Sequence, residues 1–141
     1  MNLEAEYVAK ATVKLGVLQR TGKTLEGEKL FTPIIGGVVE GPMINGKVCC
    51  GGADFGTQLT EDVVHVMAKY WIETDDGEII SVHNEGIFNE KDENARIKTT
   101  PVFKTRIGSK YEHLMVGCYV GEEEAVGNPV DTVVLTWYRL K

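Results

Sequence analysis

The sequence has few of the residues that would mark a secreted or a nucleic-acid-binding protein. Its three cysteines cannot form an even disulfide framework, and two of them, Cys49 and Cys50, are adjacent. Lysine and arginine form no local cluster, and the formal net charge is −6. A phosphate-backbone binder usually carries a basic face. We therefore expect no nucleic-acid partner, and we expect the cysteines to be buried apolar side chains rather than nucleophiles or metal ligands.

Long apolar runs are also missing. The apolar stretches are too short to cross a bilayer, and the opening residues, MNLEAEYVAK, do not have the pattern of a signal peptide. The 43% hydrophobic and 26% charged content are ordinary for a soluble globular protein. We expect one domain over residues 1–141, a cytoplasmic location and no membrane partner.

Sustained helical periodicity is absent, and alternation takes its place. In residues 3–17 every second residue is apolar, and the residues between them are largely charged or polar. A helix would spread these apolar groups around its circumference, whereas a strand collects them on one side. The pattern predicts a long strand whose core face holds Leu3, Ala5, Tyr7, Ala9, Ala11, Val13, Leu15 and Val17.

The clearest hairpin joins residues 63–74 to residues 78–84. Both arms are rich in β-branched and aromatic residues, and Asp75-Asp76-Gly77 between them suits a tight turn. If Thr74 pairs with Glu78, the even-numbered residues share one face. That face is predicted to be core, with Tyr70 and Asn84 as its polar members, while His83 faces outward.

Further strands are predicted between turn-forming glycines and prolines. Their ranges are 34–40, 47–52, 96–105, 111–121 and 130–140, and residues 55–62 are predicted to form a loop. About eight strands joined by short turns predict an all-β fold, a single closed antiparallel β-barrel. A two-sheet β-sandwich is the alternative.

A small set of polar residues interrupts these apolar segments. Asp54 follows Gly51-Gly52, and Glu40 ends a strand before Gly41-Pro42. A carboxylate in an apolar cavity is desolvated, so its pKa rises toward the range useful for acid–base chemistry. We therefore select Asp54 and Glu40 as candidate catalytic residues. The candidate ligand-binding residues are Tyr70, Asn84, Lys98 and Tyr111.

Each of these residues also has a purely structural interpretation. Asp54 can accept backbone amides in a loop, and Glu40 can pair with a lysine at the barrel rim. The three histidines, His65, His83 and His113, lack a metal-binding spacing, although the first two can share an outer face. We expect no metal and no cofactor.

Several glycine-rich and polar motifs follow one another in a characteristic order. They are Gly36-Gly37, Glu40-Gly41-Pro42, Gly46, Gly51-Gly52-Ala53-Asp54, Tyr70, Thr74-Asp75-Asp76-Gly77, Asn84 with Gly86, and Thr99 with Pro101. This order resembles uncharacterised protein family 0311 (UPF0311; domain of unknown function 3237), a family of small bacterial proteins. The resemblance covers most of the chain and implies a single-domain β-barrel, but it implies no reaction.

Three functions remain open from the sequence. The first is binding of a small, largely apolar molecule in the barrel interior or mouth. The second is cofactor-free acid–base catalysis, as in an isomerase, cyclase or hydrolase, with Asp54 and Glu40 in one cavity. The third is an oligomeric scaffold without a pocket, such as a homodimer, because Trp71 and Trp137 are both predicted to face outward.

Overall fold

The structure, a computed structural model, describes residues 2–93 and 97–141, and strands make up most of it. Among these residues a single short 3-10 helix, η1 (Glu112–Met115), lies between the eighth and the ninth strand along the chain. The strands are β1 (Ala5–Leu15), β2 (Gln19–Thr24), β3 (Gly27–Glu40), β4 (Gly46–Val48), β5 (Ala53–Gln58), β6 (Val63–Thr74), β7 (Ile79–Asn89), β8 (Ile97–Lys104), β9 (Cys118–Gly127) and β10 (Val130–Leu140). Within the described residues no helix is long and apolar enough to span a membrane.

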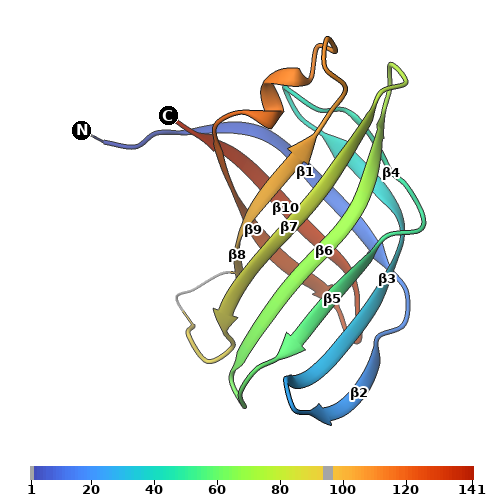
Figure 1. The fold of residues 1–141 in the computed structure, drawn as a ribbon, viewed down its shortest axis with the longest axis vertical. Helices are drawn as coiled ribbons and strands as arrows, with labels where there is room; N and C mark the ends of the chain where they lie inside the picture. The colour runs from blue at the N-terminus through green and yellow to red at the C-terminus, as the bar shows by residue number, and fades with distance from the viewer. Residues whose placement is uncertain (1, 94–96) are drawn as a thin grey trace.

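The strands close into one antiparallel barrel (Figure 1). From β6 the pairing runs through β7, β8, β9 and β10 to β1, and β1 also pairs with β3. β4 and β5 both bridge β3 and β6, so together they fill one position of the ring, which therefore has eight positions. In the described part of the chain, β2 pairs only with β3. The predicted closed barrel is confirmed, and the alternative sandwich is wrong.

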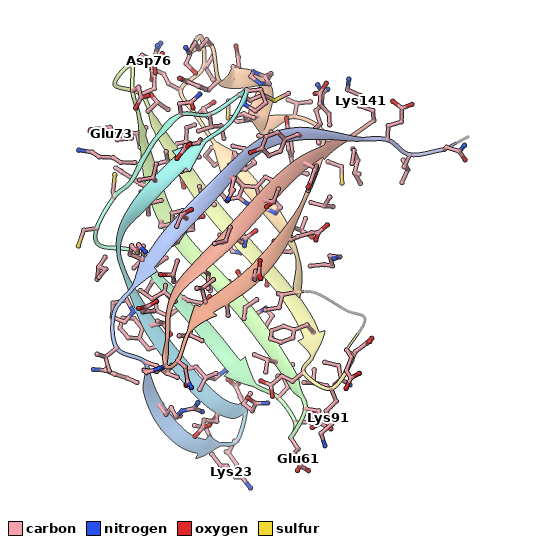
Figure 2. All side chains as sticks on the ribbon, turned by 180° about the vertical axis from the view of Figure 1, so that it is seen from behind. Lys23, Glu61, Glu73, Asp76, Lys91 and Lys141 are labelled. Carbon is pink, nitrogen blue, oxygen red and sulfur yellow. The ribbon has the colours of Figure 1, made fainter. Side chains whose placement is uncertain are left out.

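Different structural elements lie at the two ends of the barrel. Figure 2 shows Lys23, Glu61 and Lys91 at one end, called the lower end below, and Asp76 at the other, the upper end. The helix η1 packs beside the upper end, near the β6–β7 turn that carries Asp76 (Figure 1). The lower end carries the β2–β3 hairpin.

Large aromatic side chains fill part of the barrel interior. Trp137, Phe103 and Tyr119 are buried, and Phe103 contacts both of the others edge to face, with ring centroids 5.1 Å from Trp137 and 5.5 Å from Tyr119. Aromatic rings bury large areas and prefer this geometry. This part of the interior is therefore a packed core rather than a channel.

The β6–β7 hairpin has the predicted register. The Thr74 amide donates to the Glu78 carbonyl at 2.8 Å, and Ile72 lies opposite Ile80. Gly77 adopts the left-handed conformation that the tight turn requires, with φ of 87°. The even-numbered face points into the barrel, and His83 points outward, as predicted.

The first strand departs from its predicted pattern. A bulge between Tyr7 and Ala9 places Val8 in the core and leaves Tyr7 41% exposed. One extra residue in a strand shifts every side chain before it to the opposite face. The alternation therefore holds only from Ala9 onward, and Leu3 and Val17, which lie outside the strand, are exposed.

Other boundaries also differ from the predictions. The predicted strand 111–121 begins instead with η1, and β9 starts at Cys118. The predicted loop 55–62 contains most of β5, and β2 had no prediction, because neither segment has apolar alternation. The predicted strand 96–105 begins at Arg96, which lies outside the described residues.

Candidate functional site

An interior cavity of about 50 Å³ is lined by side chains of β1, β3, β5, β6, β9 and β10. Its polar lining consists of Asp54, Tyr70, Glu123 and Thr32, and the other six lining residues are aliphatic. Because a buried water needs only about 10–15 Å³, the cavity can hold a few water molecules or one small polar group.

Two glycines set the position of Asp54. Val48 pairs with Ile72 of β6, and Ala53 pairs with Lys69 of the same strand. Four residues, 49–52, therefore lie between two points of the chain that are separated by only two residues along β6. The chain must loop out and return, and Gly51 allows this with φ of 123°. At Gly52 an added Cβ would lie 2.5 Å from the Tyr70 Cβ. The double glycine therefore permits the close return that turns the next carboxylate inward.

Tyr70 contributes an unpaired hydroxyl to the cavity. The residue is 4% exposed, and its hydroxyl oxygen has no hydrogen-bond partner among the described residues. Burial, with a smaller contribution from the charge of Glu123, raises the pKa of Tyr70 far above its ordinary value. The group therefore stays a neutral hydroxyl that can donate or accept a hydrogen bond.

Glu123 is the second carboxylate of the cavity. Burial, together with the charge of Asp54, raises the pKa of Glu123 to about 7. Burial also raises the pKa of Asp54, against a hydrogen bond from the Met67 backbone and the charge of His65, which both lower it. Two carboxyl groups that face one desolvated cavity resist ionising together, so the pair retains a proton at a higher pH than either group would alone.

On the inward faces of the neighbouring strands, three further buried polar atoms have no hydrogen-bond partner among the residues that the structure describes. They are Asn84 Oδ1, Thr99 Oγ1 and Trp137 Nε1. Thr99 and Trp137 both lie opposite Gly121, one from each neighbouring strand. Buried polar atoms are nearly always paired with protein or water, so this band of the interior suits bound water or a polar ligand atom.

Glu40, Lys98 and Tyr111 do not belong to this site. Glu40 is exposed, because its neighbour Val39 takes the inward position of β3. Lys98 is exposed and pairs with Glu122 at 3.6 Å. The expectation that Glu40 and Asp54 share a cavity is therefore wrong.

Tyr111 lies at the upper end of the barrel. Its ring is buried, and its hydroxyl donates to Asp76 Oδ1 at 2.7 Å. Asp76 also accepts a hydrogen bond from the Thr74 hydroxyl at 2.6 Å and pairs with Lys110 at 3.2 Å. These contacts hold the pKa of Asp76 well below its ordinary value. Tyr111 therefore fastens η1 to the β6–β7 turn.

Sequence reasoning missed Glu123, although a signal was present. Its neighbours Glu122 and Glu124 make it one of three consecutive glutamates, which is typical of a solvated segment. Extending the alternation of Tyr119 and Gly121 by two residues would have placed Glu123 on the inward face.

Two predictions about which side chains are buried and which are exposed also need correction. Cys49 is half-buried, and Cys50 and Cys118 are exposed, so the expected buried cysteines are not observed. Trp71 is 57% exposed as expected, but Trp137 is completely buried. The two tryptophans therefore cannot form one outer surface, and the homodimer stays a prediction.

The histidines on the outer wall form a hydrogen-bonded group. His65 Nε2 lies 2.7 Å from one Glu85 carboxylate oxygen, and His83 Nε2 lies 3.0 Å from the other. The two histidines share one outer face, as predicted. In the described part of the chain, no three or more histidine, cysteine, aspartate or glutamate side chains are arranged to hold a metal ion.

Comparison with known proteins confirms the family that the sequence resembles. Residues 3–140 match the family model described as protein of unknown function (DUF3237). A UPF0311 protein of Rhodopseudomonas palustris is 40% identical over 85 residues, which cover 60% of this chain and 56% of that relative. The matched region thus spans little more than half of this relative's length. A UPF0311 protein of Clostridium acetobutylicum is 31% identical over 154 residues, covering 99% of this chain and 94% of the relative.

Solved structures resemble the whole chain. A conserved protein of unknown function from Rhodopseudomonas palustris has a TM-score of 0.87 at 31% identity, covering 100% of this chain and 99% of that one. A protein from Acinetobacter baumannii described as β-barrel like has a TM-score of 0.86 at 26% identity, covering 100% and 98%. The barrel is therefore a shared architecture.

Proposed function

Since this chain belongs to the DUF3237 family of proteins of unknown function, we propose a role for it from the geometry of its own cavity. The proposed role is binding of a small, largely apolar molecule at the lower end of the barrel. One hydrogen-bonding group of that molecule enters the cavity formed by Asp54, Tyr70 and Glu123. The observation that carries the proposal is the Tyr70 hydroxyl, which faces the cavity and has no hydrogen-bond partner among the described residues.

The surroundings of the cavity support a ligand that extends toward the lower end. Leu15 and Val133 line the cavity and are only half-buried, whereas Ile72, Ile80 and Phe103, elsewhere in the interior, are almost fully buried. Ligand sites in proteins usually measure about 300–1,000 Å³. The cavity is far smaller, so it would hold only the polar end of the ligand while the apolar part lies over the half-buried side chains.

The three polar groups define the chemistry of the ligand's polar end. Tyr70 offers a neutral hydroxyl, and Glu123 with its raised pKa offers a carboxyl proton near neutral pH. A carbonyl or hydroxyl oxygen would accept from both groups. An anionic group would be repelled once Asp54 or Glu123 ionises. We therefore expect neutral ketones, lactones or alcohols to bind, and the matching carboxylates to bind poorly.

A binding screen tests this proposal. Small neutral ketones, lactones and alcohols, each matched with its carboxylate analogue, would be screened by ligand-observed NMR and by thermal shift. For a hit, Tyr70→Phe is expected to weaken binding about tenfold, as for loss of one buried hydrogen bond of about 1.5 kcal/mol. Glu122→Gln, on the outward face of β9 beside the cavity residue Glu123, is the control and should bind like the wild type.

The outcome that contradicts the proposal is equally specific. If hits bind Tyr70→Phe and Asp54→Asn as tightly as the wild type, the cavity is not their site. If carboxylates bind as well as their neutral analogues, the assigned polarity of the cavity is wrong.

The second candidate function is cofactor-free acid–base catalysis in the same cavity. The specific observation in its favour is the pair of carboxyl groups, Asp54 and Glu123, with the pKa of Glu123 near 7. A group whose pKa lies near the working pH is suited to both giving and taking a proton. Glu123 thus takes the place that the sequence assigned to Glu40, and Tyr70 would donate a hydrogen bond to a developing oxyanion.

Proton exchange distinguishes a catalyst from a binder. Neutral ketones and lactones that bind would be incubated with the protein in D₂O, and NMR would follow exchange of the C–H protons next to the carbonyl. Catalysis predicts exchange that falls at least about 100-fold in Asp54→Asn or Glu123→Gln, within the usual contribution of acid–base groups. Binding without exchange in the wild type would leave the ligand-binding role alone.

A further inference from the structure

A large hollow lies on the outer wall of the barrel, not in its interior. It is a groove of about 830 Å³ over the outward faces of β6, β7 and β8, bordered by the looped segment 49–52 that precedes β5. Its volume falls within the range of small-molecule sites, in contrast with the interior cavity.

The register of the three strands defines the floor of the groove. One row across the strands is Trp71, Ser81 and Lys104, and the next row is Lys69, His83 and Val102. Side chains directly opposite on one face lie about 5 Å apart. The small Ser81 side chain therefore leaves a hollow beside the Trp71 indole, with a lysine at each end of one diagonal of this grid.

Apolar surface is exposed at the other two corners. The Trp71 side chain is 57% exposed and Val102 is 45% exposed. The looped segment lies beside Trp71, since the Cys49 amide donates to the Trp71 carbonyl at 2.9 Å. An exposed indole next to a wall of backbone is suited to stacking against a planar ring.

The net charge of the groove lining is positive, whereas the net charge of the whole chain is negative. Lys69 and Lys104 form no ion pair with any described residue, whereas Lys47 and Lys98 on nearby strands do. The one carboxylate in the lining, Glu85, is hydrogen-bonded to His65 and His83. The groove is therefore locally cationic on a chain with a formal net charge of −6.

We propose that this outer groove binds a planar aromatic molecule that bears one negatively charged group. The ring stacks on Trp71 over Ser81, and the anion lies against the ammonium of Lys104 or Lys69. Among the described residues, Tyr70 is the one that lines both the groove and the interior cavity, and its side chain is buried on the inward face of β6. The ligand that the groove accepts is of opposite character, since the cavity carboxyls disfavour anions. The proposal does not depend on the proposed function.

Two matched probes test the site directly. The anionic probe is 1-anilinonaphthalene-8-sulfonate, and the neutral probe is N-phenyl-1-naphthylamine, which has the same rings without the sulfonate. Both would be titrated against the intact protein while tryptophan emission is followed. Energy transfer to a bound probe quenches a buried tryptophan as well as an exposed one, so comparison of wild type with Trp71→Phe separates the signal of Trp71 from that of the completely buried Trp137. The anionic probe should bind more tightly than the neutral probe and should quench the exposed tryptophan.

Variants separate the groove from other binding surfaces. Lys69→Gln and Lys104→Gln should each weaken the anionic probe up to about fivefold, as for an exposed ion pair, and leave the neutral probe unchanged. Lys98→Gln, an exposed lysine of β8 that already has a partner, is the matched control. Trp71→Phe should weaken both probes, and Tyr70→Phe should weaken neither.

Four results would overturn the proposal. They are equal affinity for the two probes, unchanged affinity in both lysine variants, loss of binding in Tyr70→Phe, and absence of binding in the wild type. If light scattering shows a dimer and Trp71→Phe dissociates it, the groove is a contact between two copies of the chain instead.

Discussion

Asp54 and Glu123 face one interior cavity from β5 and β9, two strands that do not pair with each other. The charge of Asp54 adds to burial in raising the pKa of Glu123 to about 7. Closure of the barrel creates this relationship, because only the curvature of the sheet turns both strands' inner faces toward one point. The pair makes the interior sensitive to pH in a range where ordinary glutamates are fully ionised.

The Glu123 carboxyl should make folding less favourable as pH rises. Its pKa is about 7 in the folded chain and near the ordinary value of 4.5 in the unfolded chain, so between these values the folded state binds more protons. The free energy of unfolding should therefore fall as pH increases from about 4.5 to about 7 and then level off. Glu123→Gln should remove this fall and stabilise the protein at pH 8 by up to about 3 kcal/mol.

Urea unfolding of wild type and variant at several pH values measures this effect. Glu122→Gln is the control, because its side chain lies on the outer face and pairs with Lys98. An equal response of the two variants to pH would show that Glu123 is not the group responsible.

The Tyr70 hydroxyl should be dispensable for stability. It is buried and has no hydrogen-bond partner among the described residues, so Tyr70→Phe removes an unsatisfied polar group and keeps the ring that packs the core. We expect the free energy of unfolding to stay equal or to rise by about 1 kcal/mol. A loss of more than about 1 kcal/mol in thermal or urea unfolding would instead indicate a bound water that the hydroxyl satisfies.

Tyr111→Phe should loosen the upper end of the barrel. The change removes the hydrogen bond from the tyrosine hydroxyl to Asp76, and we expect a loss of about 1 kcal/mol at neutral pH. Because the pKa of Asp76 is lowered in the folded state, its stabilising contribution is present above the unfolded value of about 4 and is lost as pH falls below it. The difference between wild type and variant should therefore shrink in acid.

Hydrogen exchange of the η1 amides provides the measurement for this prediction. Exchange should accelerate in Tyr111→Phe at neutral pH, while amides of β1 and β10 remain protected. Uniform acceleration across the barrel would contradict a local role for this contact.

Gly86 should tolerate no side chain. A Cβ at this position would clash with the Lys98 backbone carbonyl and lie 3.3 Å from the Thr99 Cα. Relief requires movement of β7 against β8, so Gly86→Ala should cost about 1–3 kcal/mol. Gly56→Ala is the matched control within the barrel, since its Cβ would meet no atom closer than 3.4 Å. Comparable losses in the two variants, measured by urea unfolding, would contradict the predicted clash.

Several features of the fold could be predicted from local sequence. The hairpin of β6 and β7 followed from alternation and from Asp75-Asp76-Gly77, and its register placed Tyr70 and Asn84 inside correctly. The bulge at Val8 could not be predicted in this way, because it depends on how β1 pairs with β10 and not on the residues of β1 alone. Similarly, β5 forms because β3 and β6 offer it edges on both sides, although its own composition is that of a loop.

The amino-acid sequence by itself determined the all-β class, the central hairpin and the inward position of Tyr70, because a strand's period of two is a local property. It also indicated Asp54, through the two glycines before it. Only the tertiary structure decided that Glu123 rather than Glu40 accompanies Asp54, and that Trp71 and Lys104 border one groove. Those relationships join strands far apart in the chain, and they arise when the sheet closes on itself and brings separate inner and outer faces together.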